Sequence, residues 1–226
     1  MPSEKFDVVI LGGGNAAMGV TVPTRAANMS VAMIEARDLG GTCPNRGCTP
    51  KKILVAAAHA LHEIEQSKVH CISVSEPRLD WGALIAREKQ MISHIPGALG
   101  QLMAKRGVEV IREQASFVAP NAVRVGTRTL EASHLVIATG SKPRVLPIPG
   151  AEHMITSDEV LSERDLPREA VFIGGGVIAL EFSHVYRRAG VKVTILEVLP
   201  RLLPTLDADA VEKIRAESEQ IGRAHV

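Results

Sequence analysis

The chain has 226 residues, enough to bury a sizeable core in one large domain or two small ones. Its 26 basic and 25 acidic residues give a formal net charge of +1, so composition favours neither a nucleic-acid partner nor a membrane surface. The N-terminal segment lacks the apolar stretch of a signal peptide, and the three cysteines fit a reducing compartment, so we expect a soluble cytoplasmic protein.

The first element expected along the chain is a βαβ unit. Residues 8–11 form an all-apolar run typical of a strand buried on both faces, a helical pattern extends to about residue 28, and residues 31–34 are typical of a second buried strand. Pro23 falls inside the helical pattern and should kink it. Two strands joined by a helix after a glycine-rich turn predict a dinucleotide-binding unit.

The turn of this unit has the sequence G-x-G-x-x-A, and its glycines let the backbone approach a pyrophosphate. The following helix N-terminus would face the phosphates with its unpaired N–H groups. Glu35, 21 positions after Gly14, is placed to accept hydrogen bonds from a ribose. The cofactor-binding residues predicted in this turn are Gly12, Gly14, Asn15, Ala16 and Ala17.

Next comes the segment GGTCPNRGCTPKK, residues 40–52, in which four residues separate Cys43 from Cys48. Five residues of helix rise about 7.5 Å, more than the Cα separation of a disulfide, so the backbone must bend if the thiols are to meet. Pro44 and Gly47 allow a bend, and Thr49-Pro50 predicts the start of a helix whose N-terminus favours a thiolate at Cys48. This pattern predicts a redox-active pair.

Three other interpretations of these cysteines stay open at this point. A structural disulfide is one, although nothing indicates export and a small bent loop reduces easily. Zinc is another, with His59 and His62 completing four ligands, although the histidine spacing is tighter than usual. The third is two unrelated cysteines. Cys71 lies in the apolar run 69–74, where we expect it to be a small buried hydrophobe.

The middle of the chain is expected to be structural. Helical spacing predicts a packed helix up to residue 66 and another over 81–105. Short apolar runs separated by turn residues then predict strands over 108–112, 115–118, 122–125, 129–131 and 135–138. Residues 141–150 contain three prolines and resemble a linker, so we place a domain boundary near Gly150.

The βαβ pattern then repeats, with strands over 170–173 and 191–196 around a helix that ends near residue 188. Glu197 stands 21 positions after Gly176, and an acid at this strand end favours NAD over NADP, although Ala179 and Arg201 keep NADP possible. The residues expected to bind this second nucleotide are Gly174, Gly176, Val177, Ile178 and Glu197.

The end of the chain is expected to be incomplete. A helix is predicted over residues 207–220. Residues 221–226 show no pattern typical of a helix or strand and match a translated sequencing adapter. We therefore expect a truncated reading frame with a non-native tail. The predicted fold is α/β, with two Rossmann-like, three-layer dinucleotide-binding units, the second truncated. The predicted domains are an FAD-binding domain over 1–150, an NAD(P)-binding domain over 151–220 and the tail 221–226.

Together these motifs resemble the N-terminal half of the class I pyridine nucleotide-disulfide oxidoreductases, relatives of which include dihydrolipoamide dehydrogenase, glutathione reductase and mercuric reductase. The resemblance implies that electrons pass from NAD(P)H through FAD to Cys48, and that Cys43 is the interchange thiol that meets a small-molecule or protein disulfide or dithiol. It implies that Lys51 or Lys52 lies near the flavin and pairs with Glu181. It adds six FAD-contacting positions, namely Gly41, Thr42, Ala115, Ala138, Thr139 and Gly140.

Two residues depart from the family pattern. Arg46 stands where relatives often carry a small aliphatic residue, and Glu113 stands where they commonly have glycine. The family's proton-accepting histidine and its dimerisation domain belong to a C-terminal half that this sequence does not contain, so we expect a homodimer only in a full-length protein. The alternative function is a truncated FAD/NAD-binding module without turnover. No metal, nucleic acid or membrane partner is expected.

Overall fold

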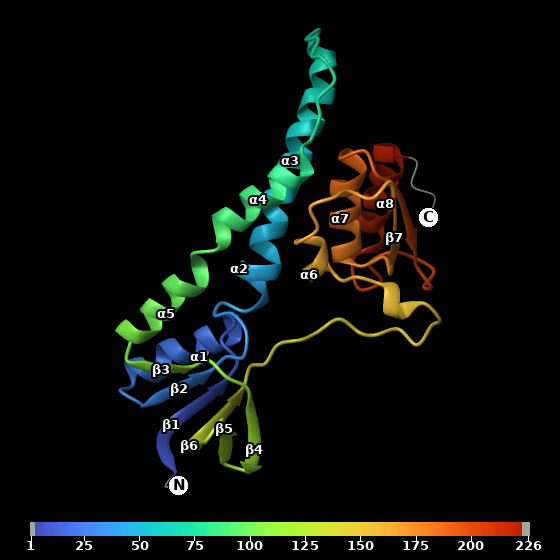
Figure 1. Cartoon of the computed structure of the whole chain (residues 1–226). Coiled ribbons are helices and arrows are strands. Elements are labelled where there is room, and N and C mark those ends of the chain that lie inside the picture. Colours follow the sequence, from blue (N-terminus) through green and yellow to red (C-terminus); the bar gives the residue numbers. More distant parts are fainter. Residues whose placement is uncertain (1–2, 223–226) are drawn as a thin grey trace. The chain divides into compact units, whose positions relative to one another are not determined.

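Strand β1 (Glu4–Leu11) lies near the middle of a six-stranded sheet, and its last four residues, Val8 to Leu11, are buried. Helix α1 (Asn15–Ala26) leads from it to β2 (Val31–Ile34), which pairs with β1 in parallel. This is the βαβ unit that the apolar runs predict. Helix α1 continues through Pro23 as one element. The computed structural model describes residues 3–222 of the chain (Figure 1).

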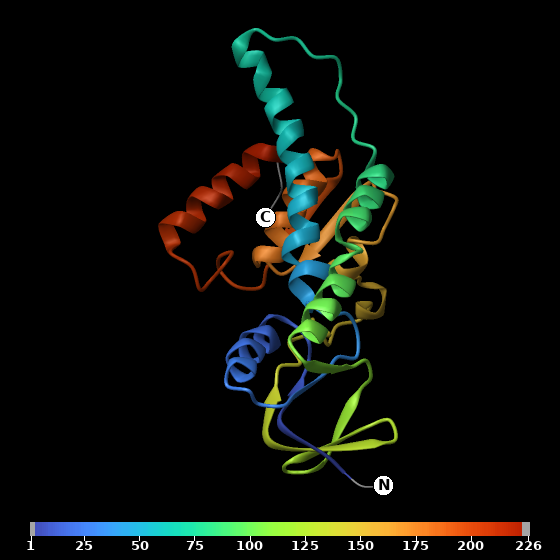
Figure 2. The same ribbon diagram turned by 90° about the vertical axis from the view of Figure 1, so that its left-hand side faces the viewer.

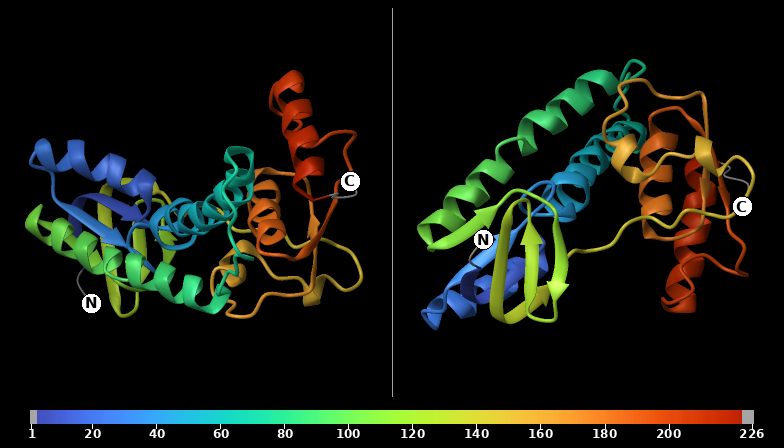
Figure 3. Two further views of the ribbon diagram at one scale, coloured as in Figure 1. Left: turned by 90° about the horizontal axis from the view of Figure 1, so that it is seen from above. Right: turned by 60° about the horizontal axis from the view of Figure 1, so that its bottom comes forward.

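The sheet has the strand order β3-β2-β1-β6-β5-β4. Strands β3 (Val108–Ile111) and β6 (Arg128–Ile137) extend its parallel part, whereas β4 (Ala115–Ala119) and β5 (Ala122–Val125) add an antiparallel edge beside β6 (Figure 3). The prediction of separate strands over 129–131 and 135–138 is wrong, because one long strand pairs with β5 through its first half and with β1 along its length.

Apolar side chains cover both faces of this sheet. One cluster joins Ile10 and Met33 to Ala17 of α1 and Met103 of α5 (Ile95–Lys105). The second cluster, around Val9 and residues of β5 and β6, covers the opposite face. Burial on both faces explains why β1 and β2 are continuous apolar runs and not alternating ones.

Between β2 and β3 lie helices α2 (Thr42–Arg46), α3 (Cys48–Gln66), η1 (Ser67–His70) and α4 (Trp81–Ile92), followed by α5. The prediction of one helix over 81–105 is wrong, since it breaks between α4 and α5 before Pro96, which lacks a backbone N–H to continue the helical hydrogen bonds. Helices α3 and α4 run side by side in the views of Figures 1 and 2.

Cys71 is not the buried hydrophobe that its apolar surroundings predict. It is exposed at the end of η1 with a φ of 60°, and its neighbours Val69 and Ile72 are 75% and 54% exposed. The apolar run 69–74 therefore belongs to a surface connection and not to a strand.

A second sheet consists of β7 (Glu169–Ile173) and β8 (Lys192–Leu196), which pair in parallel around α7 (Val177–Arg188). Short helices η2 (Ala151–His153) and α6 (Ser157–Val160) precede it, and α8 (Ala208–Gly222) follows. Its core contains Trp81 of α4, Leu54 of α3 and Tyr186 of α7, whose ring meets that of Trp81 edge-on at 5.5 Å. This is the second predicted βαβ unit, and the α/β fold class is confirmed.

Contacts divide the chain into two units that do not follow it linearly. Residues 1–50 and 90–156 form one unit, and residues 51–89 and 157–226 form the other. The expected boundary near Gly150 lies close to the end of the first unit, but helix α3 beyond Pro50 and most of α4 belong to the second. The expected tail begins at Ile221, which α8 includes, while residues 223–226 lie outside the described part.

Candidate functional site

The first glycine turn brings backbone atoms into close contact. Gly12 has a φ of +105° and donates its N–H to the carbonyl oxygen of Ile34 at 2.7 Å. A Cβ atom at this position would lie 2.2 Å from the carbonyl oxygen of Ala138, so only glycine fits. Gly14 forms the N-cap of α1 without a capping side chain, and the first turn of α1 contains no acidic residue. The N–H groups at this helix end are thus available for an anion.

Glu35 closes this turn from the end of β2. Its carboxylate accepts hydrogen bonds from the N–H of Gly13 at 2.6 Å and from the N–H of Arg37 at 2.7 Å. The predicted ribose-binding acid therefore lies against the glycine turn, at the same sheet edge. One carboxylate oxygen fixes the turn, which leaves the further lone pairs of the carboxylate for hydroxyl donors.

The second turn repeats this arrangement in the second unit. Glu197 accepts hydrogen bonds from the N–H of Gly175 at 2.6 Å and from the N–H of Leu199 at 2.8 Å. These backbone donors, that of Leu199 first, lower the pKa of the Glu197 carboxyl. Gly176 caps α7 without a side chain, and a Cβ atom there would meet nothing within 4 Å. The next two residues, Val177 and Ile178, are exposed at the helix start.

The two cysteines lie on either side of a helix break, as their spacing predicts. Cys43 is within α2, Gly47 separates the helices, and Cys48 begins α3. Both thiols are free: Cys43 is partly buried and Cys48 is exposed. The Cys48 thiol is the largest cause of the raised pKa of Cys43, so the bend brings the two side chains within reach of each other, which a continuous helix would not do.

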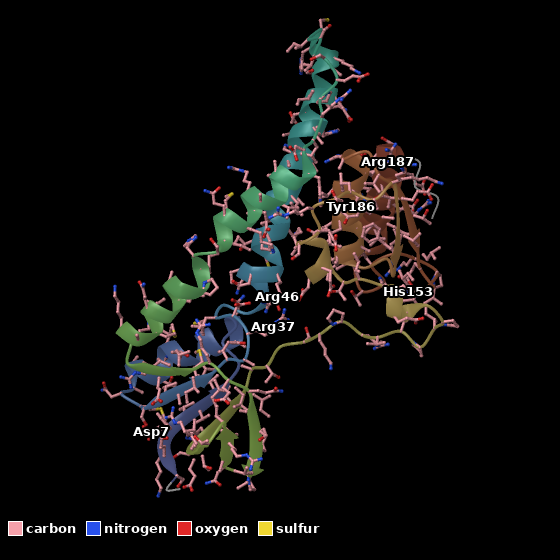
Figure 4. The ribbon with its side chains drawn as sticks, viewed as in Figure 1. Asp7, Arg37, Arg46, His153, Tyr186 and Arg187 are labelled. Atoms are coloured by element: carbon pink, nitrogen blue, oxygen red, sulfur yellow. The ribbon has the colours of Figure 1, made fainter. Side chains whose placement is uncertain are left out.

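Polar contacts hold the segment between the cysteines. The buried Asn45 amide donates to the carbonyl oxygens of Leu39 at 3.0 Å and Gly41 at 2.9 Å. Arg46, which Figure 4 labels, pairs with Asp38 at 2.8 Å and is 15% exposed. The departure at position 46 is thus accommodated by an ion pair within the loop. The sequence analysis did not identify Asn45 as a residue that holds this segment. Its position as a polar residue between the two cysteines was the signal that could have indicated this role.

The surroundings of Cys43 act on its thiol in opposite directions. The hydrogen bond from the Cys48 thiol, followed by burial, raises the pKa of Cys43. The Asn15 side chain and the backbone N–H of Cys48 hydrogen-bond the same sulfur and lower this pKa. The net result is a pKa of Cys43 above the ordinary thiol value.

Lys51 and Glu181 form an ion pair between α3 and α7, both in the second unit. The side chains are 17% and 37% exposed. Of the two lysines considered, Lys51 makes this contact, whereas Lys52 is exposed. The pairing that the resemblance implies is therefore present, and its catalytic role stays a prediction.

The zinc interpretation finds no support in the geometry. Cys48 and His59 lie in one continuous helix, and eleven residues of helix rise about 16 Å, far more than two zinc bonds span. Within residues 3–222 no three histidine, cysteine, aspartate or glutamate side chains gather as a metal site. His59 instead lies 3.6 Å from Glu63.

The other predicted FAD contacts belong to the first unit. Gly41, with a φ of +65°, caps α2, and Thr42 is exposed at its first position. Ala138 follows β6 and donates to the carbonyl oxygen of Leu11 at 2.8 Å, ahead of Thr139 and Gly140. Ala115 begins β4 opposite Val125. Their contacts with a cofactor stay predictions.

Two glycine turns, two uncapped helix starts and two acids at strand ends together provide what a dinucleotide needs: space for the phosphates, N–H donors and a ribose acceptor. The residues present thus fit a dinucleotide in each unit. None of the helices in residues 3–222 combines the length and apolar character needed to cross a bilayer.

Comparisons with known proteins agree with this geometry. A family model described as pyridine nucleotide-disulphide oxidoreductase matches residues 6–222. The dihydrolipoyl dehydrogenase of Chlorobaculum parvum is 32% identical over 97% of this chain, and the match covers 48% of that protein's length. The dihydrolipoyl dehydrogenase of Acholeplasma laidlawii is 32% identical over 92% of this chain, and the match covers 64% of that protein's length. Among solved structures, the Cu(II) complex of the HOCl-induced flavoprotein disulfide reductase RclA from Escherichia coli is similar to this chain, with a TM-score of 0.82 and 29% sequence identity. The match covers 99% of this chain and 50% of the RclA chain.

Proposed function

The chain belongs to the pyridine nucleotide-disulphide oxidoreductase family, and from this premise we propose that it serves electron transfer from NAD(P)H through FAD to the Cys43–Cys48 pair and on to a disulfide, or the reverse. The observation that carries the proposal is the placement of two free cysteines, Cys43 and Cys48, on either side of the break between α2 and α3, where the Cys48 thiol acts on the Cys43 thiol. Two thiols within reach of each other convert between dithiol and disulfide with little backbone movement.

The thiol chemistry balances as follows. The Cys43 thiolate attacks one sulfur of the substrate disulfide, whose S–S bond breaks and releases one substrate thiolate. The Cys48 thiolate then attacks the Cys43 sulfur, releases the second substrate thiolate and leaves a Cys43–Cys48 disulfide. Each turnover consumes two electrons, which FAD, when bound, relays from NAD(P)H to the cysteine pair.

The remaining residues of the site would bind and orient the two dinucleotides. The α1 N-terminus and Glu35 would bind FAD in the first unit, with the α7 N-terminus and Glu197 binding the nicotinamide dinucleotide in the second. Glu197 favours NAD, because a 2′-phosphate would face its charge. The Lys51–Glu181 pair supplies a cation that can stabilise negative charge on a reduced ring.

Counting thiols tests the redox role. After mild oxidation, peptide mapping should find a Cys43–Cys48 disulfide with Cys71 left free, and anaerobic NADH with FAD should restore two thiols per chain. The Cys43→Ser and Cys48→Ser variants should each form no intramolecular disulfide. Random pairing that includes Cys71, or a pair that NADH with FAD does not reduce, would contradict the proposal.

A second candidate is a nucleotide-binding module without turnover. The chain spans about half the length of most of the curated relatives it matches, so residues they supply to turnover can lie outside it. Stoichiometric flavin binding with NADH-reducible thiols but no release of thiol from a disulfide substrate would favour this candidate. We propose that the protein acts in the cytoplasm as a homodimer on a small-molecule or protein disulfide or dithiol, with no nucleic-acid or membrane partner.

A further inference from the structure

Two side chains near the end of α2 hold this helix against the loop that precedes it. The buried amide of Asn45 donates to the carbonyl oxygens of Leu39 at 3.0 Å and Gly41 at 2.9 Å. The guanidinium of Arg46 lies 2.8 Å from the carboxylate of Asp38, and the Arg46 side chain is 15% exposed, so most of it lies against protein and not in solvent. Helix α2 has only five residues, so these contacts, and not its own hydrogen bonds, fix its position.

The loop itself is a fixed support, because it packs against the first glycine turn. The N–H of Gly40 donates to the carbonyl oxygen of Gly13 at 2.8 Å. A Cβ atom on Gly41 would lie 2.8 Å from the Cα atom of Gly14, so the two backbones are in close contact there. The two side chains therefore connect α2 to backbone that is already held in place.

The position of α2 sets the position of one cysteine relative to the other. Cys43 lies within α2, and Cys48 begins α3 directly after Gly47. A Cβ atom on Gly47 would lie 3.4 Å from the Cα atom of Cys43, so the chain turns back on α2 just before α3 begins. A movement of α2 therefore changes the separation of the two thiols.

We propose that Arg46 is a positioning residue whose ion pair with Asp38 holds α2 in the conformation that the Cys43–Cys48 disulfide requires, and so favours the disulfide over the dithiol. This inference rests on the proposed function and assigns Arg46 a role in the redox equilibrium of the same site. A disulfide holds the loop in place with or without the ion pair, whereas a dithiol without the ion pair is free to relax. Loss of the ion pair therefore raises the free energy of the disulfide form more than that of the dithiol form.

An effect of charge on the thiols would have a different signature. A cation near a thiolate stabilises it, so removing Arg46 as a charge would disfavour the ionised dithiol and favour the disulfide, and removing Asp38 would do the opposite. A positioning role requires both removals to disfavour the disulfide, since either one breaks the same ion pair. The signs of the two changes thus separate positioning from charge.

The test is the equilibrium of the 226-residue chain with buffers of reduced and oxidised glutathione at pH 7 without oxygen. As the Cys43–Cys48 bond forms, the two thiols lose two electrons and two protons to oxidised glutathione, whose S–S bond breaks to give two thiols. The mixture is quenched with acid and labelled with N-ethylmaleimide, and the intact mass gives the number of labels. A reduced chain carries three labels and a chain with this disulfide carries one, which peptide mapping assigns to Cys71.

For Arg46→Gln we expect the equilibrium constant of disulfide formation to fall about threefold, an effect typical of an ion pair of this exposure. Asp38→Asn should lower the constant by the same factor, and the double variant should fall no further, because the same ion pair is removed in each case. Arg46→Lys keeps a cation for Asp38 and should restore most of the wild-type constant. Arg128→Gln is the matched control, because it removes the ion pair of Arg128 with Glu4 elsewhere in the first unit and should leave the constant unchanged.

Unchanged constants in Arg46→Gln and Asp38→Asn would overturn the inference, as would shifts of opposite sign or falls that add in the double variant. Those outcomes leave reduction of the cysteine pair by NADH with FAD, and hence the proposed function, standing. A wild-type chain that forms no Cys43–Cys48 disulfide would instead overturn both. Failure of this inference and failure of the proposed function are thus distinguishable.

Discussion

At the scale of single residues, Glu88 is a buried acid outside the redox site. Its side chain is fully buried on α4, neither carboxylate oxygen has a hydrogen-bond partner within residues 3–222, and the Lys89 ammonium lies 3.7 Å from one of them. Burial raises the pKa of the Glu88 carboxyl above its ordinary value of 4.5. The folded protein therefore binds this proton more tightly than the unfolded chain, and ionisation at neutral pH weakens the fold.

We expect Glu88→Gln to raise the free energy of unfolding at pH 8 by about 1–3 kcal/mol, because the amide removes a buried charge at nearly constant shape. In the wild-type chain the contribution of Glu88 is fully present below pH 4.5 and declines as pH rises through the raised pKa. Urea unfolding at pH 5 and pH 8 should show this decline, and the variant should lack it. An equally large decline in the variant would refute this account of Glu88.

The contribution of His184 to stability depends on pH in the opposite direction to that of Glu88. Its Nε2 atom lies 2.8 Å from the hydroxyl of Ser218, and burial, followed by the charge of Arg188, lowers its pKa below 6.5. The unfolded chain binds this proton more tightly, so the contribution is present above pH 6.5 and is lost as pH falls through the lowered pKa.

His184→Gln should therefore flatten the loss of stability below pH 6.5. The glutamine keeps a polar partner for Ser218 but does not titrate. Thermal unfolding from pH 5 to pH 7.5 measures the effect, with His153→Gln as control, since His153 is 84% exposed. The same slope in His184→Gln as in the wild-type chain would mean that other groups cause the pH dependence.

At the scale of elements, the cysteine segment packs closely against the first glycine turn, at Gly41 and Gly14. Gly41 has a φ of +65° and approaches Gly14, so Gly41→Ala should cost about 1–3 kcal/mol of stability and weaken flavin binding. Gly19→Ala, in the middle of α1 with nothing within 4 Å of the new methyl group, should instead stabilise by about 0.5–1 kcal/mol.

Denaturant midpoints and flavin fluorescence check both glycine variants together. The account of the turn contact requires opposite signs for the two alanine substitutions. A Gly41→Ala variant with unchanged stability and unchanged flavin affinity would show that the backbones of Gly41 and Gly14 do not need to approach so closely.

The Lys51–Glu181 pair joins α3 to α7 but should add little to stability. Glu181 is more than one-third exposed, so solvent screens the pair, and Glu181→Gln should change the free energy of unfolding by less than about 1 kcal/mol. A double-mutant cycle with Lys51→Met measures the coupling. A coupling of several kcal/mol would show that the pair is structural and would argue against its proposed electrostatic role at the flavin.

Local patterns predicted the elements that carry the site. Four-residue apolar runs and glycine spacing located β1, α1 and β2 and, 162 positions later, the second turn, because Gly12 and Gly174 occupy equivalent places. Cysteine spacing predicted the bend at Gly47. The continuous strand β6 and the α4–α5 break were missed, since pairing with β1 and β5 and the geometry of the turn at Ser93 and His94 are set by tertiary contacts.

The side-chain partners at the site were harder to predict. Nothing local in the sequence connects Asn15 with Cys43, or Arg46 with Asp38, because these pairs form only when the loops come together. The surface position of Cys71 was missed for the same reason: an apolar run predicts burial only if another element covers it.

At the scale of the whole molecule, the two units share the same nucleotide-binding features but differ in their reactive side chains. Each has a glycine turn, an uncapped helix start and a carboxylate at a strand end, but only the first adds a cysteine pair next to its turn. Two nucleotide units with one thiol pair are what transfer of electrons from a nicotinamide through a flavin to a disulfide requires. The chain spans about half the length of most of the curated relatives it matches.

The most direct test of the central claim is the absorbance of the FAD-loaded chain beyond the flavin bands during anaerobic titration with dithiothreitol. A Cys48 thiolate lying against the oxidised flavin should produce a long-wavelength charge-transfer band after two electrons. The band should be present in Cys43→Ser without reductant and absent from Cys48→Ser. Stoichiometric flavin with no band in the reduced wild-type chain, or a band that persists in Cys48→Ser, would contradict the proposed path of electrons.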